Sequence, residues 1–155
     1  MTYRHNSIVG KRNFAIHVPS ATVSARMSAV KQKNTAPELA VRHIVHSLGI
    51  RYRVCSMTIE GRPDLSNQSQ KWCIFVHGCF WHGHDCHRGS LPKGNLVFWA
   101  PKIARNKERD KEVARQLRTH GFRVLTVWQC SLKKPERLRK RIAHFLRVRV
   151  EQGPR

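Results

Sequence analysis

The spacing of hydrophobic residues along the chain predicts three helices. In PELAVRHIVHSLG (37–49) apolar side chains recur three and four positions apart, and Thr35 stands where an N-cap is expected. A longer helix is predicted from about residues 98–101 to His120, where a glycine follows, and a third over residues 134–148. The inward-facing positions are Ala40, Val41, Ile44, Val45 and Leu48 in the first helix and Leu138, Ile142 and Phe145 in the third.

Three further segments have the pattern of strands. RYRVC (51–55) alternates in polarity, KWCIFVH (71–77) is mostly apolar on both faces, and FRVLTVWQ (122–129) is the third. The order along the chain is therefore helix, strand, strand, helix, strand, helix. This order predicts a mixed α/β domain.

The net charge indicates the kind of partner. The chain has 30 Lys and Arg against 9 Asp and Glu, a formal charge of +21 over 155 residues, which is length enough for one domain. A charge of this size favours a polyanionic partner, most often nucleic acid. The basic residues are spread along the sequence, which favours a basic face on a folded body over a disordered basic arm.

The folded domain is expected over residues 24–148, between a basic, mobile N-terminal arm (1–23) and a C-terminal tail (149–155). No apolar run approaches the ~20 residues of a membrane span, and the N-terminus lacks a secretory hydrophobic region. We therefore expect a cytoplasmic protein. In a reducing compartment, five cysteines, two of them close to histidines, favour metal binding over disulfides.

The segment FVHGCFWHGHDCHR (75–88) holds four histidines and two cysteines. Cys79 and Cys86 are the strongest candidates for zinc ligands, because thiolates dominate structural zinc sites, and His84 lies two residues before Cys86. The fourth ligand must come from elsewhere. Cys130 ends a predicted strand, where it would meet a loop leaving the neighbouring strand. The alternative is a pair of free cysteines near surface histidines.

Among the nine carboxylates, Asp64 follows a GRP turn and precedes His77, the end of a hydrophobic strand, by thirteen residues. With Glu38 on an upstream helix, this arrangement resembles the PD-(D/E)xK nuclease core; a turn aspartate is the alternative. Asp110 falls on the core-facing stripe of the long helix, where a carboxylate needs a partner. We expect His82 to be that partner, because Asp can orient an imidazole and raise its basicity. The alternative is a surface charge network in ERDKE.

The run FVHGCFWHGHDC, with GRPD upstream and FW (98–99), NKERD (106–110) and VLTVWQC (124–130) downstream, resembles the very-short-patch repair (Vsr) DNA mismatch endonuclease family. The resemblance covers residues 24–148. It implies an α/β fold with a restriction-endonuclease-like three-layer core and a structural zinc. It also implies Mg²⁺-dependent nicking of one strand of duplex DNA 5′ to the thymine of a T:G mismatch, which arises when 5-methylcytosine deaminates.

The resemblance implies roles for individual residues as well. Asp64 matches the magnesium-binding aspartate, and Val76 matches a residue that binds the same ion through its backbone carbonyl. His82 matches the general base and Asp110 its orienting partner. The remaining matches are Glu38 (a supporting acid), His77 (beside the scissile phosphate), Cys79, His84, Cys86 and Cys130 (zinc ligands), Phe80, Trp81 and Trp99 (aromatics inserted beside the mismatch) and Met27 (a residue that enters the DNA from the other groove).

Exposed aromatic rings have a physical use in such a protein. A mismatched pair is easier to unstack than a matched one, and an inserted ring recovers lost stacking, worth ~1–3 kcal/mol per base. Phe80, Trp81 and Trp99 are therefore expected to be exposed, on a loop that zinc keeps rigid. From the residues alone, Trp99 is better interpreted as a core aromatic at the start of a helix.

The chain departs from the family pattern after Asp64, where a hydrophobic strand is usual and this sequence has LSNQSQKW. Two alternatives to the mismatch endonuclease stay open. One is a zinc-stabilised DNA-binding protein without catalytic activity, and the other is a related nuclease of different site specificity. The family also makes mismatch-repair proteins and a cytosine methyltransferase candidate partners. We expect a monomer that associates with the bacterial nucleoid when bound to DNA.

Overall fold

The computed structural model describes residues 33–92 and 96–148, so the predicted N-terminal arm, Met27 and the C-terminal tail lie outside the described residues. None of the helices in this part of the chain is long and apolar enough to cross a membrane. The elements are the helices α2 (Ala36–Ser47), α3 (Leu96–Thr119) and α4 (Pro135–Leu146), the 3₁₀ helices η1 (His87–Gly89) and η2 (Gln129–Lys133), and the strands β1 (Arg53–Val54), β2 (Leu65–Asn67), β3 (Trp72–His77) and β4 (Arg123–Trp128).

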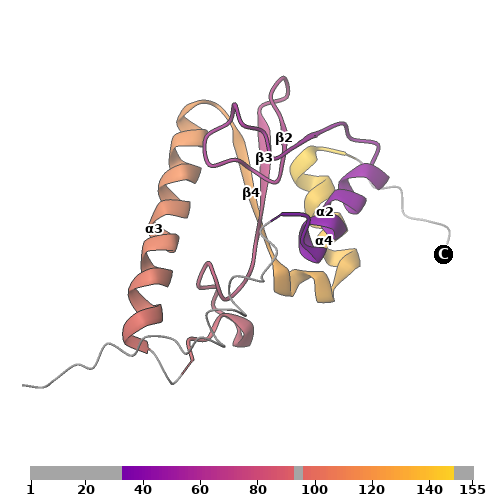
Figure 1. Cartoon of the computed structure of the whole chain (residues 1–155). Coiled ribbons are helices and arrows are strands. Elements are labelled where there is room, and N and C mark those ends of the chain that lie inside the picture. Colours follow the sequence, from indigo (N-terminus) through magenta and orange to yellow (C-terminus); the bar gives the residue numbers. More distant parts are fainter. Residues whose placement is uncertain (1–32, 93–95, 149–155) are drawn as a thin grey trace, which may run out of the picture.

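The four strands form one mixed sheet in the order β1-β2-β3-β4. The first two neighbouring pairs are antiparallel, and β3 and β4 are parallel, in register from Trp72 opposite Arg123 to His77 opposite Trp128. A parallel pair needs a crossover connection, which α3 supplies. Figure 1 shows α3 on one face of the sheet and α2 and α4 on the other. The predicted three-layer α/β arrangement is therefore present.

Each face of the sheet has its own core, because side chains alternate along a strand. Trp72 and Ile74 of β3 pack with α2 and α4, and the fully buried Val41 and Val45 of α2 lie in this larger cluster. Cys73 and Phe75 point the other way and pack beneath α3. By the same alternation His77 lies on the α3 side of the sheet, where it lines a cleft.

The predicted inward faces of two helices need correction. In α2 the buried positions are Glu38, Val41 and Val45, whereas Ala40, Ile44 and Leu48 are only half-buried. Ile44 and Leu48 lie at the margin of the core and pack against its border. In α4 the prediction is right for Leu138 and Ile142, but Phe145 is half-buried, and the Arg123 guanidinium covers its ring at 5.4 Å from the centroid.

One strand, β2, was not predicted from the sequence. It is short and polar, yet Leu65 and Ser66 are almost fully buried and pair with Ile74 and Cys73 of β3. The Asn67 side chain closes the hairpin, because its Oδ1 accepts hydrogen bonds from Ser69 Oγ at 2.8 Å and from the Gln70 N–H at 2.9 Å. The LSNQSQKW departure therefore still folds as a strand and a turn beside β3.

Candidate active site and metal centre

A cleft of about 1190 Å³ opens at the carboxyl end of β3. Its walls come from the first turn of α2, the turn at residues 61–64, the end of β3, the loop after it and the middle of α3. All the residues predicted for catalysis line this one cleft: Glu38, Asp64, Val76, His77, His82 and Asp110. Segments far apart in the sequence thus converge on a single site.

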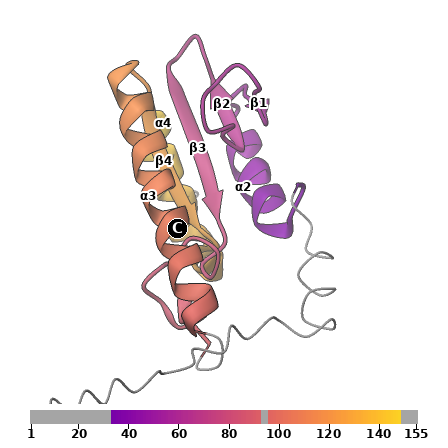
Figure 2. The ribbon, with the colours of Figure 1, turned by 60° about the vertical axis from the view of Figure 1, so that its left-hand side comes forward.

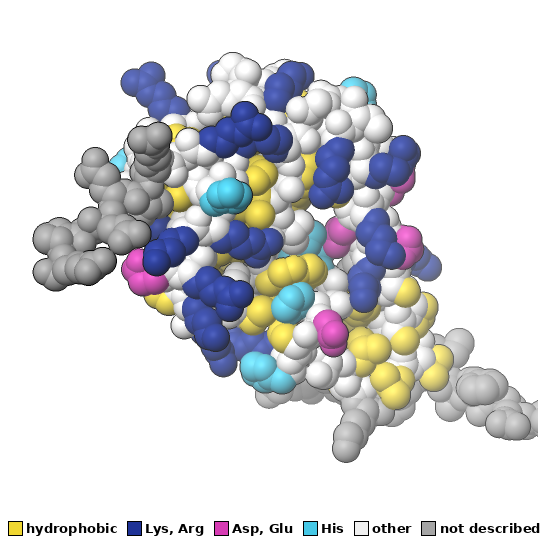
Figure 3. All heavy atoms as spheres, turned by 180° about the vertical axis from the view of Figure 1, so that it is seen from behind, with side chains coloured by type: hydrophobic (Ala, Val, Ile, Leu, Met, Phe, Trp, Pro, Cys, Tyr) yellow, Lys and Arg dark blue, Asp and Glu magenta, His cyan; other side chains and the backbone are white. Residues whose placement is uncertain are grey.

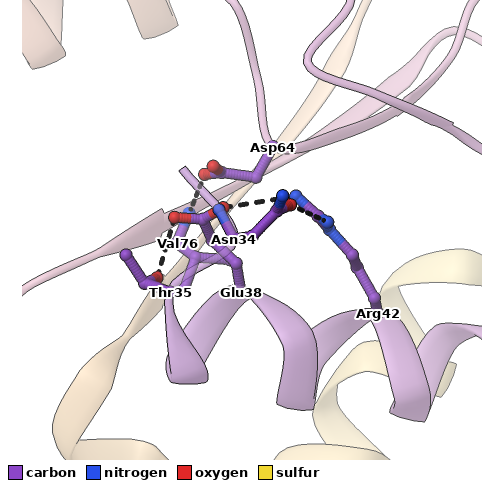
Figure 4. Close-up of polar contacts among 6 residues, drawn as sticks. All are labelled: Asn34, Thr35, Glu38, Arg42, Asp64 and Val76. Atoms are coloured by element: carbon purple, nitrogen blue, oxygen red, sulfur yellow. Dashed lines mark hydrogen bonds and ion pairs between the residues drawn. The ribbon is translucent and has the colours of Figure 1, made fainter. Parts of the chain in front are cut away.

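Two carboxylates form one side of the cleft (Figure 4). Asp64 Oδ2 accepts a hydrogen bond of 2.7 Å from the Val76 N–H. Glu38 is buried and accepts from the Asn34 N–H at 2.9 Å, Thr35 Oγ1 at 2.7 Å and Arg42 Nη2 at 3.2 Å. Thr35 is the N-cap of α2, as predicted, but its hydroxyl donates to Glu38 instead of accepting from the helix backbone.

Burial raises the pKa of the Asp64 carboxyl to about 6; the hydrogen bond from Val76 opposes this rise, and the negative charge of Glu38 adds to it. The charged form of Asp64 is therefore disfavoured both by its removal from water and by repulsion from Glu38. A cation bound here would offset both effects.

The donor set at Asp64 suits a hard cation. Within a strand the N–H and C=O of one residue point to the same side, and the Val76 N–H points at Asp64. The Val76 carbonyl therefore faces Asp64 too. It lies two residues past Ile74, the residue of β3 that pairs with the first residue of β2. Carboxylate and carbonyl oxygens are the ligands that Mg²⁺ prefers. The residues present fit the ion that the sequence predicted.

A histidine–aspartate pair forms the opposite wall of the cleft. His82 Nδ1 lies 2.5 Å from Asp110 Oδ2, so the carboxylate accepts the Nδ1 proton and leaves Nε2 with a free lone pair. The predicted contact is therefore present. Burial opposes a low pKa for Asp110, but the hydrogen bond from His82 and the charges of His77 and His82 lower it.

His77 stacks on His82, with ring centroids 3.8 Å apart and planes 11° apart, and its Nδ1 lies 3.8 Å from the same oxygen of Asp110. Burial lowers the pKa of His77 to about 4, with repulsion by His82 acting in the same direction and the charge of Asp110 opposing both only in part. At neutral pH His77 is therefore an uncharged side chain in the cleft.

The loop after β3 folds back on itself through successive turns. The His84 N–H donates to the Cys79 carbonyl at 2.9 Å, the Cys86 N–H to the His84 carbonyl at 2.9 Å and the Gly89 N–H to the Cys86 carbonyl at 2.8 Å. These bonds bring Cys79, His84 and Cys86 together with Cys130, the second residue of η2 after β4, and the four ligand atoms all lie within 4.8 Å of one another.

Sulfur and imidazole donors in this number suit tetrahedral Zn²⁺. Cys79 is fully buried, its Sγ lies 3.4 Å from the Cys130 N–H that donates to it, and Cys130 Sγ lies 3.5 Å from His84 Nδ1. The structure therefore brings together the four residues predicted as zinc ligands, and their donor set fits the ion.

Gly89→Ala is expected to destabilise this loop. A Cβ at Gly89 would lie 1.9 Å from the His84 carbonyl oxygen and 3.1 Å from that of Cys79, both of them backbone atoms. The backbone of the loop would have to shift to relieve this clash. The free energy of unfolding is expected to fall by an amount on the order of 2–4 kcal/mol. Thermal unfolding of the zinc-loaded protein measures the loss, with the exposed neighbour Ser90→Ala as control. Equal melting temperatures for the two variants would contradict the tight turn.

The aromatic residues form a cluster and are less exposed than predicted. The Phe80, Trp81 and Trp99 rings meet edge to face, with centroids 5.1–5.7 Å apart. Trp99 is only 5% exposed, so its predicted exposure is wrong, and Phe80 and Trp81 are half-buried. Large rings without a partner bury one another. The exposed apolar residues at this end of the molecule are instead Leu96, Val97 and Phe98, at the start of α3.

The cleft also holds residues that sequence reasoning did not single out. The basic side chains of Arg62, Lys102 and Arg109 line it, and Lys102 Nζ lies 5.4–5.8 Å from the Trp81, Phe98 and Trp99 ring centroids. Helical spacing could have found Lys102 and Arg109, since both lie close to Asn106 and Asp110 on α3. Arg42 could have been found in the same way, four residues after Glu38.

The family model for the DNA mismatch endonuclease Vsr matches residues 3–88. The type II nicking enzyme V.XorIIP of Xanthomonas oryzae pv. oryzae is 45% identical over 120 residues, which cover 77% of this chain and 88% of that protein. The DNA mismatch endonuclease Vsr of Escherichia coli K12 is 38% identical over 118 residues, 76% of either protein.

Among solved structures, the catalytic domain of the homing endonuclease I-Bth0305I superposes with a TM-score of 0.50 at 21% identity, over 72% of this chain and 93% of that chain. This likeness supports the nuclease-like α/β fold. From the match to the family model and the identity to these relatives, the chain belongs to the Vsr family of DNA mismatch endonucleases.

Proposed function

We propose that this DNA endonuclease nicks one strand of duplex DNA 5′ to the thymine of a T:G mismatch, in a reaction that depends on Mg²⁺. The observation that carries the proposal is the cleft itself. One wall offers the carboxylates of Asp64 and Glu38, and the opposite wall offers His82 with Asp110 behind it. A phosphodiester between the two walls would have a metal site on one side and a proton acceptor on the other.

Asp64 and the Val76 carbonyl would hold the ion, with Glu38 as the supporting acid. When bound there, Mg²⁺ lowers the pKa of a coordinated water and offsets charge on the phosphate. The protein holds Asp64 in place through the Val76 N–H, and Arg42 holds Glu38. Both contacts keep the oxygens positioned before substrate arrives.

His82 would act as the general base. Its Nδ1 proton is directed at Asp110, so Nε2 accepts the proton of the attacking water, and the carboxylate stabilises the imidazolium that forms. His77 would lie beside the scissile phosphate. Because burial keeps His77 neutral, it can donate a hydrogen bond there without a second charge in the site.

The aromatic cluster would read the mismatch. Insertion of Phe80, Trp81 and Trp99 into the stack exchanges ring–ring contacts within the protein for ring–base contacts, and a mismatch lowers the cost of opening the stack. The zinc cluster would keep their loop rigid. Met27, proposed for the other groove, lies outside the described residues.

The test is a nicking assay on end-labelled duplexes that carry a T:G pair in CT(A/T)GG and in other flanking sequences, beside the matched duplexes, with and without Mg²⁺. A Mg²⁺-dependent nick 5′ to the mismatched thymine supports the proposal. Cleavage without preference for T:G would indicate the related nuclease of other specificity. Binding without any nick would indicate the DNA-binding protein.

Asp110→Asn is expected to slow nicking by about 10³–10⁴-fold, because an amide neither fixes the His82 tautomer nor stabilises the imidazolium. Duplex affinity should change little, since Asp110 faces His82 and not the solvent side of α3. Single-turnover rates measure the effect. Glu108→Gln on the same helix is the control, because Glu108 is exposed and its one ion pair among residues 33–92 and 96–148 is with Lys111. A rate within tenfold of the original would rule out Asp110 as the orienting residue.

A further inference from the structure

Helix α4 carries the densest concentration of positive charge in the described chain outside the cleft. Between Gln129 and Val148 there are seven Lys and Arg and one acid, Glu136. Six of these cations are exposed, and five of the six are called here the α4 ridge: Lys133, Lys134, Arg137, Lys140 and Arg141. Lys133 and Lys134 directly precede α4. At 100° per residue Arg137, Lys140 and Arg141 fall within an arc of about 100°, on the side of the helix away from its buried positions Leu138, Ile142, Ala143 and Leu146.

The basic residues of the ridge have no acidic neighbours to neutralise them, whereas those of α3 do. On α3 the acids alternate with the bases, and Lys111 pairs with Glu108 at 2.8 Å and Arg115 with Glu112 at 2.7 Å. No ridge residue has an acidic partner within 4.0 Å among residues 33–92 and 96–148. Five like charges within nine residues repel one another, so the ridge is stabilised when an anion lies along it.

The ridge begins beside the cleft. Gln129 lines the cleft and begins η2, which leads directly to Lys133 and Lys134. Further along, Arg141 Nη2 donates to the Thr126 carbonyl of β4 at 3.2 Å, and Thr126 also lines the cleft. Figure 1 shows α4 next to α2 on the face of the sheet opposite α3, and in the view of Figure 2 α4 lies behind β4. The view in Figure 3 shows Lys and Arg side chains over much of the surface and few acids.

We infer that the α4 ridge is a second DNA-binding surface, which contacts backbone phosphates of the duplex outside the segment held in the cleft. This inference rests on the chain being a DNA endonuclease, and it does not depend on the proposed preference for a T:G mismatch. Twelve residues of helix extend about 18 Å, the length of roughly five base pairs at 3.4 Å each. The contact is to phosphates, so it adds affinity and orientation without reading sequence.

The test compares two triple variants that remove the same charge. Lys134→Gln/Arg137→Gln/Lys140→Gln, the ridge variant, neutralises three of the five ridge cations, and Lys111→Gln/Arg115→Gln/Arg118→Gln, the α3 variant, neutralises three exposed cations of α3. Affinities for matched duplexes of about 10 to 30 base pairs are measured against KCl concentration by fluorescence anisotropy. A third variant, Lys134→Arg/Arg137→Lys/Lys140→Arg, keeps the charge. Melting temperatures verify that all three variants fold.

On the long duplexes the ridge variant is expected to bind at least about tenfold more weakly, with a slope of log Kd against log salt reduced by up to about 0.9 for each lost contact. The α3 variant and the charge-keeping variant should retain the slope, and on the shortest duplexes the ridge and α3 variants should match. Equal losses in both neutralised variants at every length would overturn the inference in favour of long-range attraction alone. An undiminished affinity of the ridge variant would overturn it too and direct the search to an acidic protein partner.

Discussion

Asp64→Asn is expected to abolish nicking, with a loss of at least about 10³-fold, while duplex affinity stays within a few-fold. Asn is nearly isosteric, and its amide oxygen can still accept the 2.7 Å hydrogen bond from the Val76 N–H. The variant therefore keeps the local structure and loses only the negative charge. Single-turnover nicking on the T:G duplex and anisotropy binding on the same duplex measure the two effects separately.

Glu60→Gln is the matched control, since Glu60 is an exposed acid only four residues away that does not line the cleft. Its nicking rate should be unchanged. If the Asp64→Asn variant nicked DNA at close to the original rate, Asp64 would not be the ligand of the catalytic metal. Loss of binding together with nicking would mean that Asp64 is structural, and the proposed role would fail.

The same substitution should stabilise the protein when no Mg²⁺ is added. The folded-state pKa of Asp64 is about 6, above its ordinary 3.8, so its contribution to stability falls as pH rises from about 4 to 6 and stays low above that. Asp64→Asn removes this dependence. At pH 8 its free energy of unfolding should exceed the original by on the order of 1–3 kcal/mol, and at pH 4 the two should agree. Added Mg²⁺ should stabilise only the protein that keeps Asp64.

If the cluster binds zinc as predicted, Cys79→Ser is expected to abolish zinc binding and to destabilise the domain by several kcal/mol. Cys79 is fully buried, and the Cys130 N–H donates to its sulfur, so the substitution would leave two thiols and one imidazole around a position that lacks its fourth ligand. Elemental analysis and thermal unfolding measure the two effects. Cys55→Ser is the control, because Cys55 is half-buried and lies outside the cluster.

Cys86→His separates loss of the ion from loss of the side chain. Imidazole is itself a zinc ligand, and Cys86 is the less buried of the two loop cysteines. This variant should retain most of its zinc and melt above Cys79→Ser. If Cys79→Ser kept one zinc per chain and an unchanged melting temperature, the four-residue cluster would not be a metal site.

The sequence was informative where the pattern was long or chemically unusual. Helix α3 was predicted with its functional stripe, and Asp110 meets His82 as expected, because a carboxylate on a core-facing stripe has to find a donor. The four cysteine and histidine residues of the cluster were found from ligand chemistry and from the end of a strand, since the parallel neighbours β3 and β4 release their loops at the same edge.

The misses have physical causes of a different kind. Strand β2 has three residues and a polar sequence, and only its pairing with β3 makes it a strand. Trp99 is buried because rings from two separate segments of the chain meet in space. The spacing of hydrophobic residues along one segment cannot reveal such a contact. In α2 the apolar positions cover a wide arc, so periodicity alone could not choose Val41 and Val45 over Ile44 and Leu48 as the deepest.

Eleven consecutive residues, from Val76 to Cys86, hold three members of the metal cluster, both histidines of the cleft and two rings of the aromatic cluster. One added or deleted residue in this stretch would displace all of them together. The stretch should therefore change only by substitution during evolution, and recognition of new flanking sequences should arise in other segments. For protein engineering, the residues that line the cleft from α2 and α3 and take no proposed part in the reaction, such as Lys102 and Arg109, are the positions at which target preference should be varied, with Glu38 and Asp110 kept.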